Sequence, residues 1–265
     1  MSFRNTFVAF LSSVATLAAS SAFAQSQQPL RIALSASPVA ESVHYVAKKA
    51  KEQGLDVKVI EFTDWVTPNS ALANKDVDVN FFQHVPFLEN AKRANNWPFT
   101  AVSPGYITWL GAYSDKLKSI DQLPEGATVS IANDPVNTGR ALLFLQSLNL
   151  VKLKEGVDFR ATLQDIVANP KKLKIIQVEA QQVVRSLPDV HLGLTFPSFI
   201  RLAGREPTSA IVFEKPSKQY AIHWVTRTEN ANDPRLAKFV QLYNSDPEVK
   251  ALLTRLYAGQ IGFAW

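Results

Sequence analysis

The chain has 265 residues, is 46% hydrophobic and carries a formal net charge of +5 at pH 7. This length accommodates one large domain or two lobes of about 100 residues each. The basic residues are scattered along the chain, which argues against a nucleic-acid-binding protein, and the absence of cysteine excludes disulfides.

Residues 1–24 have the features of an export signal peptide. Arg4 is followed by an uncharged apolar run over residues 7–19, and Ala22-Phe23-Ala24 is typical of a signal peptidase site. The run is shorter than the roughly 20 residues that a membrane-spanning helix needs, although an uncleaved anchor is the alternative interpretation. With no lipobox cysteine for a lipid, we expect a protein that is periplasmic and soluble after signal-peptide cleavage.

Strands and helices alternate along the rest of the chain. The first half predicts strands over residues 30–34, 57–62 and 77–82, with helices over 39–53, 68–75 and 86–94. The pattern restarts with strands over 127–132, 173–178 and 191–194 and a helix over 140–148, and it closes with helices over 234–243 and 247–257. This alternation predicts an α/β protein with parallel sheets.

Two aromatic and β-branched segments, 106–113 and 220–226, are candidates for interlobe connections. They divide the chain into lobe one, residues 30–105 plus 227–265, and lobe two, residues 114–219. The expected architecture is therefore a two-lobe clamp with two crossover strands, and a single doubly wound domain is the alternative.

The sequence gives little support to catalysis or to metal binding. It has no G-x-S-x-G elbow and no H-x-x-x-H or H-E-x-x-H spacing, and thiolate ligands are impossible. A metal site built from distant residues such as Asp78 and His84 remains an alternative. We predict a non-enzymatic protein that needs no cofactor.

The first cluster with a candidate function is Phe81-Phe82-Gln83-His84-Val85-Pro86-Phe87, at the end of the third predicted strand. Open α/β sheets bind ligands at the carboxyl ends of their strands, so this position suits a ligand site. Core packing is the alternative for each phenylalanine, but a buried imidazole such as that of His84 needs polar partners.

The second cluster is Asn133-Asp134-Pro135-Val136-Asn137-Thr138-Gly139-Arg140, between a strand and a helix. Thr138 is expected to cap that helix, whose free N–H groups suit an anion. Arg140 can hold a carboxylate through two parallel hydrogen bonds. A capped helix with a surface arginine is the alternative.

Three segments together resemble the NlpA family, whose best-known members are methionine-binding proteins of ABC importers. They are Phe62-Thr63-Asp64-Trp65-Val66-Thr67-Pro68-Asn69, Asp78-Val79-Asn80-Phe81-Phe82-Gln83-His84 and the Asn133–Arg140 cluster. The similarity continues through 169–175 and 187–189 to Trp265. The resemblance implies a two-lobe periplasmic-binding-protein fold.

By the same resemblance, Trp65, Phe82, His84 and Phe87 occupy ligand-contacting positions, and Arg140 corresponds to the arginine that holds the amino-acid carboxylate. Such a set suits a ligand with an apolar side chain and one carboxylate. Trp65 and Phe87 each replace a tyrosine of the family and so remove a hydroxyl.

A further departure concerns two asparagines that anchor the amino-acid head group in methionine-binding members. The matching regions, 195–198 and 220–223, contain no asparagine, and Ser198 and His223 are the candidate polar replacements. We therefore expect a substrate-binding protein that captures methionine or a related small amino acid and delivers it to an inner-membrane ABC permease. Another apolar amino acid, a short peptide, an organic acid or, with less support, a metal is the alternative ligand.

Overall fold

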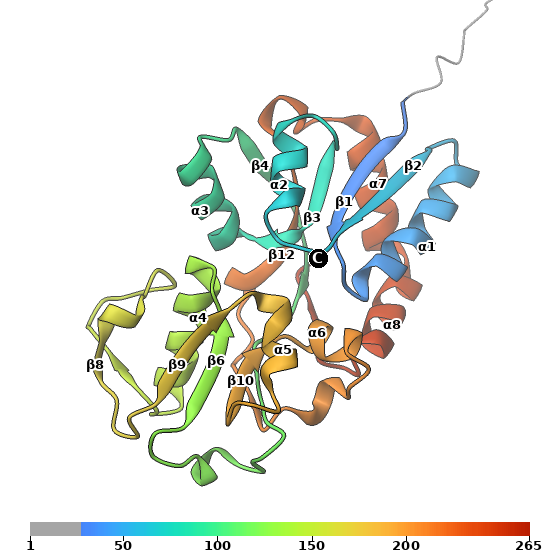
Figure 1. Ribbon diagram of the computed structural model, residues 1–265. Coiled ribbons are helices and arrows are strands. Elements are labelled where there is room, and N and C mark those ends of the chain that lie inside the picture. Colours follow the sequence, from blue (N-terminus) through green and yellow to red (C-terminus); the bar gives the residue numbers. More distant parts are fainter. Residues whose placement is uncertain (1–27) are drawn as a thin grey trace, which may run out of the picture.

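The computed structural model describes residues 28–265, so the predicted signal peptide lies outside the described residues. The described chain forms two lobes, each built on its own sheet (Figure 1). This confirms the two-lobe α/β fold predicted from the alternating pattern.

The larger sheet has six strands in the order β13-β4-β12-β3-β1-β2. β1 pairs in parallel with both β2 and β3, as two strand–helix–strand crossovers require, whereas β12 runs antiparallel to β3 and β4. The strands are β1 (Leu30–Ser35), β2 (Val57–Phe62), β3 (Val79–His84), β4 (Phe99–Ile107), β12 (Ala221–Arg227) and β13 (Gly262–Phe263).

Helices cover both faces of this sheet. They are α1 (Val39–Glu52), α2 (Thr67–Ala73), α3 (Val85–Asn95), α7 (Pro234–Ser245) and α8 (Pro247–Leu256). One core joins α1, α7 and α8 to β1, β3 and β12, with Val43, Trp224 and Phe239 fully buried. A smaller core on the other face contains Leu72 of α2 and Leu88 of α3.

The second sheet has five strands in the order β11-β5-β10-β6-β9, and a two-stranded sheet, β7-β8, lies beside it. The strands are β5 (Gly111–Tyr113), β6 (Thr128–Ala132), β7 (Lys152–Leu153), β8 (Ile166–Ala168), β9 (Lys174–Val178), β10 (Leu192–Thr195) and β11 (Val212–Phe213). Its helices are α4 (Pro135–Ser147), α5 (Val183–Ser186) and α6 (Pro197–Leu202). The apolar side of α4, which includes Leu142 and Leu145, is buried in the core of this lobe.

The chain passes between the two sheets twice. β4 stays in the larger sheet until Ile107 and β5 begins at Gly111, while the return lies between Phe213 of β11 and Ala221 of β12. The structure therefore places most of 220–226 within the larger sheet, as β12, because its buried apolar side chains pair with both β3 and β4. The lobe boundaries at 105, 114, 219 and 227 stay a prediction.

The start of α4 also differs from the prediction. The helix begins at Pro135 rather than at Arg140, because Asp134 accepts a hydrogen bond from the Asn137 N–H as its N-cap and proline suits the first helical position. Thr138 is therefore not the cap, and its hydroxyl instead donates to the Ala132 carbonyl oxygen at 2.8 Å. Arg140 lies one and a half turns inside the helix, on its buried side.

Candidate functional site

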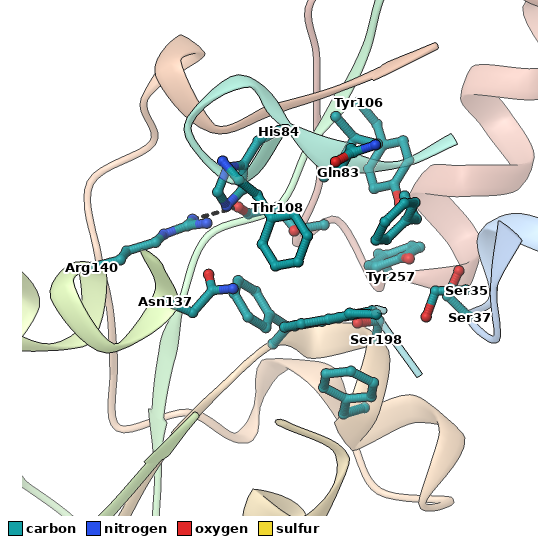
Figure 2. Close-up of a pocket in the computed structure, with 16 residues that line it drawn as sticks. Ser35, Ser37, Gln83, His84, Tyr106, Thr108, Asn137, Arg140, Ser198 and Tyr257 are labelled. Carbon is teal, nitrogen blue, oxygen red and sulfur yellow. Dashed lines mark hydrogen bonds between the residues drawn. The ribbon is translucent and has the colours of Figure 1, made fainter. Parts of the chain in front are cut away.

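A pocket lies between the two sheets and encloses about 610 Å³ of space, including the part that opens to solvent. Figure 2 shows the 16 side chains that line it. They come from strand ends and loops of the larger sheet, from the passage between the sheets, and from α4 and the start of α6 in the second lobe: Ser35, Ser37, Trp65, Phe82, Gln83, His84, Phe87, Tyr106, Thr108, Asn137, Arg140, Phe196, Ser198, Phe199, Ile222 and Tyr257. The pocket thus lies at the strand ends, where an open α/β sheet binds ligands.

His84 ends β3 and caps α3. Its Nδ1 accepts a hydrogen bond from the Phe87 N–H at 3.2 Å, which leaves the proton of a neutral ring on Nε2. Burial, with a further contribution from the Arg140 cation, lowers the pKa of His84 to about 3, and the neighbouring Asn137 side chain opposes this fall. The imidazole is therefore neutral at physiological pH and offers an N–H donor.

Arg140 is 2% exposed, and its guanidinium is hydrogen-bonded to other residues of the protein. Its Nη2 donates to the Thr108 carbonyl oxygen at 2.8 Å (Figure 2). Its Nε donates to Glu214 Oε1 at 2.9 Å, and Nη2 contacts the same carboxylate. The guanidinium also stacks on Tyr220, with its central carbon 3.8 Å from the ring centroid. These contacts fix the orientation of the cation.

The ion pair with Glu214 changes the expected chemistry of Arg140. Nε and Nη2 are already engaged, and within residues 28–265 only Nη1 has no hydrogen-bond partner. A ligand carboxylate would thus meet one nitrogen with two N–H groups, rather than the complete fork predicted from the sequence. Glu214 also balances the charge of Arg140.

Asn137, one turn before Arg140 on α4, offers an acceptor at the same end of the pocket. Its Nδ2 donates to both carboxylate oxygens of Asp134, at 3.1 and 3.0 Å, which fixes the amide orientation. Its Oδ1 is buried and has no hydrogen-bond partner among the described residues. Such an orphaned acceptor is unfavourable unless a ligand or water satisfies it.

Aromatic side chains from both lobes surround the rest of the pocket. Trp65 follows β2 and lies edge-on to Phe87, with ring centroids 6.3 Å apart, and Phe82 lies 5.9 Å from Phe87. Across the pocket, the Trp65 ring packs on Phe196 and Phe199 of the second lobe, with ring centroids 6.0 and 5.5 Å apart. These rings form walls suited to an apolar side chain.

The structure brings six of the seven predicted site residues to this pocket: Trp65, Phe82, His84, Phe87, Arg140 and Ser198. His223 does not line it, because successive side chains of β12 point to opposite faces and its neighbour Ile222 lines the pocket instead. The Nδ1 of His223 lies 2.8 Å from the Ala221 carbonyl oxygen.

Sequence reasoning missed several lining residues. Asn137 belongs to the motif that contains Arg140, and its helical spacing to Arg140 would have revealed it had the helix start been placed at Pro135. Ser35, Ser37, Tyr106 and Tyr257 carry no local signal, because they meet only through the packing of β1, β4 and α8. Gln83 also lines the pocket, and its amide is held by Asn69 and Asn80 at 2.6 to 3.0 Å.

The described residues contain no group of three or more His, Cys, Asp or Glu side chains placed to hold a metal ion. Among the same residues, no helix has the length and apolar character needed to cross a membrane.

The comparisons with known proteins agree with this geometry. The sequence model described as NlpA lipoprotein matches residues 30–265. The D-methionine-binding lipoprotein MetQ of Escherichia coli K12 is 39% identical over 230 residues, which is 86% of this chain and 84% of that protein.

Two solved structures show the same fold. A nutrient binding protein from Burkholderia cenocepacia bound to methionine is 38% identical with a TM-score of 0.85, over 89% of this chain and 100% of the other. An ABC transporter periplasmic substrate-binding protein from Coxiella burnetii is 34% identical with a TM-score of 0.84, over the same shares. The relatives are transport proteins that bind substrates, so the prediction of a non-enzymatic protein is confirmed.

The predicted localisation requires correction. We expected a soluble periplasmic protein with no lipobox cysteine, yet the family is described as lipoproteins and the E. coli relative is named one. These names indicate a lipid-anchored family, so the inference from missing cysteine to a freely diffusing protein is wrong, although the sequence itself contains no cysteine.

The family model covers almost the whole described chain, and relatives and solved structures agree with it in sequence and in fold. The chain therefore belongs to the NlpA lipoprotein family.

Proposed function

We propose that this chain is the substrate-binding protein of an ABC importer and that it captures methionine or a related small amino acid between its two lobes. The observation that supports this most directly is the buried guanidinium of Arg140 at one end of a pocket with aromatic walls. The relatives that bind methionine or serve ABC transporters support the same role.

In this proposal the carboxylate of the ligand accepts hydrogen bonds from Arg140 Nη1 and from the Nε2–H of His84. The ammonium group donates to Asn137 Oδ1, which otherwise has no hydrogen-bond partner among the described residues. The apolar part of the side chain packs between Trp65, Phe82 and Phe87. Each polar group of the amino acid thus meets a complementary group that the protein already holds in place.

Capture depends on both lobes. His84 and Phe87 come from the larger sheet and its helix α3, whereas Asn137 and Arg140 come from α4 of the second lobe. A ligand that touches both sets favours the closed arrangement, because only that arrangement satisfies both ends at once. The closed form would then be the one that docks on the permease. We place the lobes at 30–105 plus 227–265 and at 114–219.

A different ligand in the same transport role is the second candidate. Two apolar side chains, Phe196 and Ile222, line the pocket in the regions where methionine-binding members are expected to carry head-group asparagines. An apolar organic acid without an ammonium group would need fewer acceptors than an amino acid. Binding of methionine and of its analogue without the amino group, 4-(methylthio)butanoate, separates the two candidates, since only the amino acid carries a donor for Asn137 Oδ1.

The test is calorimetric titration of methionine into the wild type and into Arg140→Ala. We expect one site per chain and an affinity at least about tenfold weaker in the variant, on the scale of a charge-assisted hydrogen bond. Arg140→Lys keeps a cation beside Glu214, so it tests the guanidinium without leaving a buried carboxylate unpaired. Arg205→Ala, which breaks a surface ion pair with Asp115, is the matched control. Equal affinities in all four proteins would remove Arg140 from the site.

A further inference from the structure

A carboxylate outside the pocket balances the charge of the cation that lines it. Within residues 28–265, Arg140 is the only lysine, arginine, aspartate or glutamate that lines the pocket, and it lies at the same end as His84 and Asn137 (Figure 2). Glu214 does not line the pocket, yet its Oε1 and Oε2 accept hydrogen bonds from Arg140 Nε at 2.9 and 3.2 Å. Because the His84 imidazole is neutral, this end of the pocket carries no net charge.

The two passages between the sheets hold Glu214 in place. Its Oε1 accepts a hydrogen bond from the Leu110 N–H at 2.7 Å, and its own N–H donates to the Leu110 carbonyl oxygen at 2.9 Å. The Glu214 side chain is only 12% exposed. A carboxylate held in this way cannot turn away into solvent, and charges inside a protein are screened less than charges in water. The negative charge of Glu214 therefore acts on whatever binds beside Arg140.

This fixed charge has opposite effects on the two ends of an amino-acid head group. It repels the carboxylate, which offsets part of the attraction of Arg140, and it attracts the ammonium group beside Asn137. A zwitterion experiences both effects, whereas an anion without an ammonium group experiences only the repulsion. Asp134 is a second carboxylate near Asn137, but it lies at the positive start of α4 and accepts hydrogen bonds from the backbone and side chain of Asn137.

We propose that Glu214 is a specificity-determining residue, which makes the pocket favour a zwitterionic amino acid over an anionic ligand of the same shape. This inference rests on the proposed function, because it requires the ligand carboxylate at Arg140 and the ammonium group at Asn137. Without Glu214 the same end of the pocket would carry the unbalanced charge of Arg140, which suits a monoanion better. Glu214 thus selects the charge of the ligand from a position outside the pocket.

The test compares methionine with 4-(methylthio)butanoate, which lacks only the amino group, each titrated calorimetrically into the wild type and into Glu214→Gln. Glutamine keeps an acceptor for the Leu110 N–H and removes the charge. We expect the wild type to bind methionine more tightly, and the ratio of the two affinities to fall about tenfold in the variant, on the scale of one charge pair inside a protein. The analogue should bind the variant more tightly than the wild type, because its carboxylate is no longer repelled.

Two further variants separate the effect of charge from an effect on structure. Glu214→Asp keeps the charge on a shorter side chain and should preserve the preference for methionine. Asp115→Asn removes a carboxylate from the surface ion pair with Arg205 and is the matched control, because it should leave both affinities unchanged. A purely structural loss at position 214 would weaken both ligands together and leave their ratio as it is in the wild type.

An unchanged ratio in Glu214→Gln would overturn the role of Glu214 in specificity, whether or not both affinities fall. Methionine would still bind to the wild type in that case, so the proposed function would stand. Tighter binding of the analogue than of methionine by the wild type would also overturn this role, and that result does not depend on the folding of a variant. If the wild type bound neither compound, the proposed function would fail and the inference with it.

Discussion

At the scale of single residues, neighbouring side chains determine the charge at the candidate site. Arg140 is paired with Glu214, and His84 is neutral because it is buried beside that cation. The sequence allowed both residues to be selected, because a histidine after a strand and an arginine near a helix start are local patterns. It could not reveal Glu214, which lies far away in the chain and meets Arg140 only in the folded protein.

The neutral state of His84 predicts how stability depends on pH. Unfolded histidine takes up a proton near pH 6.5, whereas the folded pKa is about 3, so between these values the unfolded state binds more protons. Stability from this residue is fully present above pH 6.5 and is lost as the pH falls toward 3. At pH 5 the loss is roughly 2 kcal/mol, taking about 1.4 kcal/mol for each pH unit.

Urea unfolding at pH 7 and pH 5 measures this contribution. On acidification His84→Gln should lose about 2 kcal/mol less stability than the wild type. Both proteins have the same aspartates and glutamates, so the contribution of these groups cancels in the comparison. His44→Gln changes an exposed histidine that contacts Glu61 and is the control. Equal acid losses in the wild type and in His84→Gln would show that His84 is not buried in its neutral form.

At the scale of elements, helix α4 positions the head-group end of the site. Asp134 and Pro135 begin the helix, and this start brings Asn137 and Arg140 to the pocket one turn apart. Strands and helices with strong periodicity, such as β2 and α7, were predictable within a few residues. The start of α4 was not, because its cap signal competed with a second one at Thr138.

Gly139 allows α4 to approach the backbone of Phe159, in the segment that follows the helix. A Cβ at this position would lie 2.1 Å from the Phe159 carbonyl oxygen, so backbone would have to move. We expect Gly139→Ala to lower the stability by about 1–3 kcal/mol, the usual cost of overpacking, and to weaken ligand binding by displacing Arg140. Thermal unfolding and calorimetry check both effects.

Gly262→Ala is the matched control, because its Cβ would make only an ordinary contact with Trp109, at 3.4 Å. Similar melting temperatures for Gly139→Ala and Gly262→Ala would contradict the close approach of α4 and Phe159.

At the scale of the whole molecule, Trp65 links the two lobes. It extends from the loop after β2 to Phe196 and Phe199 of the second lobe, and a hydrogen bond of 3.0 Å from Gln181 Nε2 to the Thr63 carbonyl oxygen lies beside it. The two-lobe fold followed from the repeated strand–helix pattern. The contacts between the lobes could not be predicted from that pattern, because they depend on three-dimensional packing.

Trp65→Ala should shift the lobes toward an open arrangement. Aromatic pairs contribute roughly 0.5–1.5 kcal/mol each beyond the area they bury, so losing two of them weakens both closure and ligand binding. Small-angle scattering without ligand should give a larger radius of gyration than the wild type, and addition of methionine should restore it only in part. Trp97→Ala removes a tryptophan that stacks on Phe99 within one lobe and should leave the radius unchanged.

The most direct test of the central claim is a crystal structure of the protein grown with saturating methionine, with the sulfur located by its anomalous scattering. We predict one methionine between the lobes, its carboxylate at Arg140 and His84, its ammonium at Asn137 and its sulfur between the rings of Trp65, Phe82 and Phe87. Methionine bound elsewhere, or a pocket without it at saturating concentration, would contradict the proposed capture of an amino acid between the lobes.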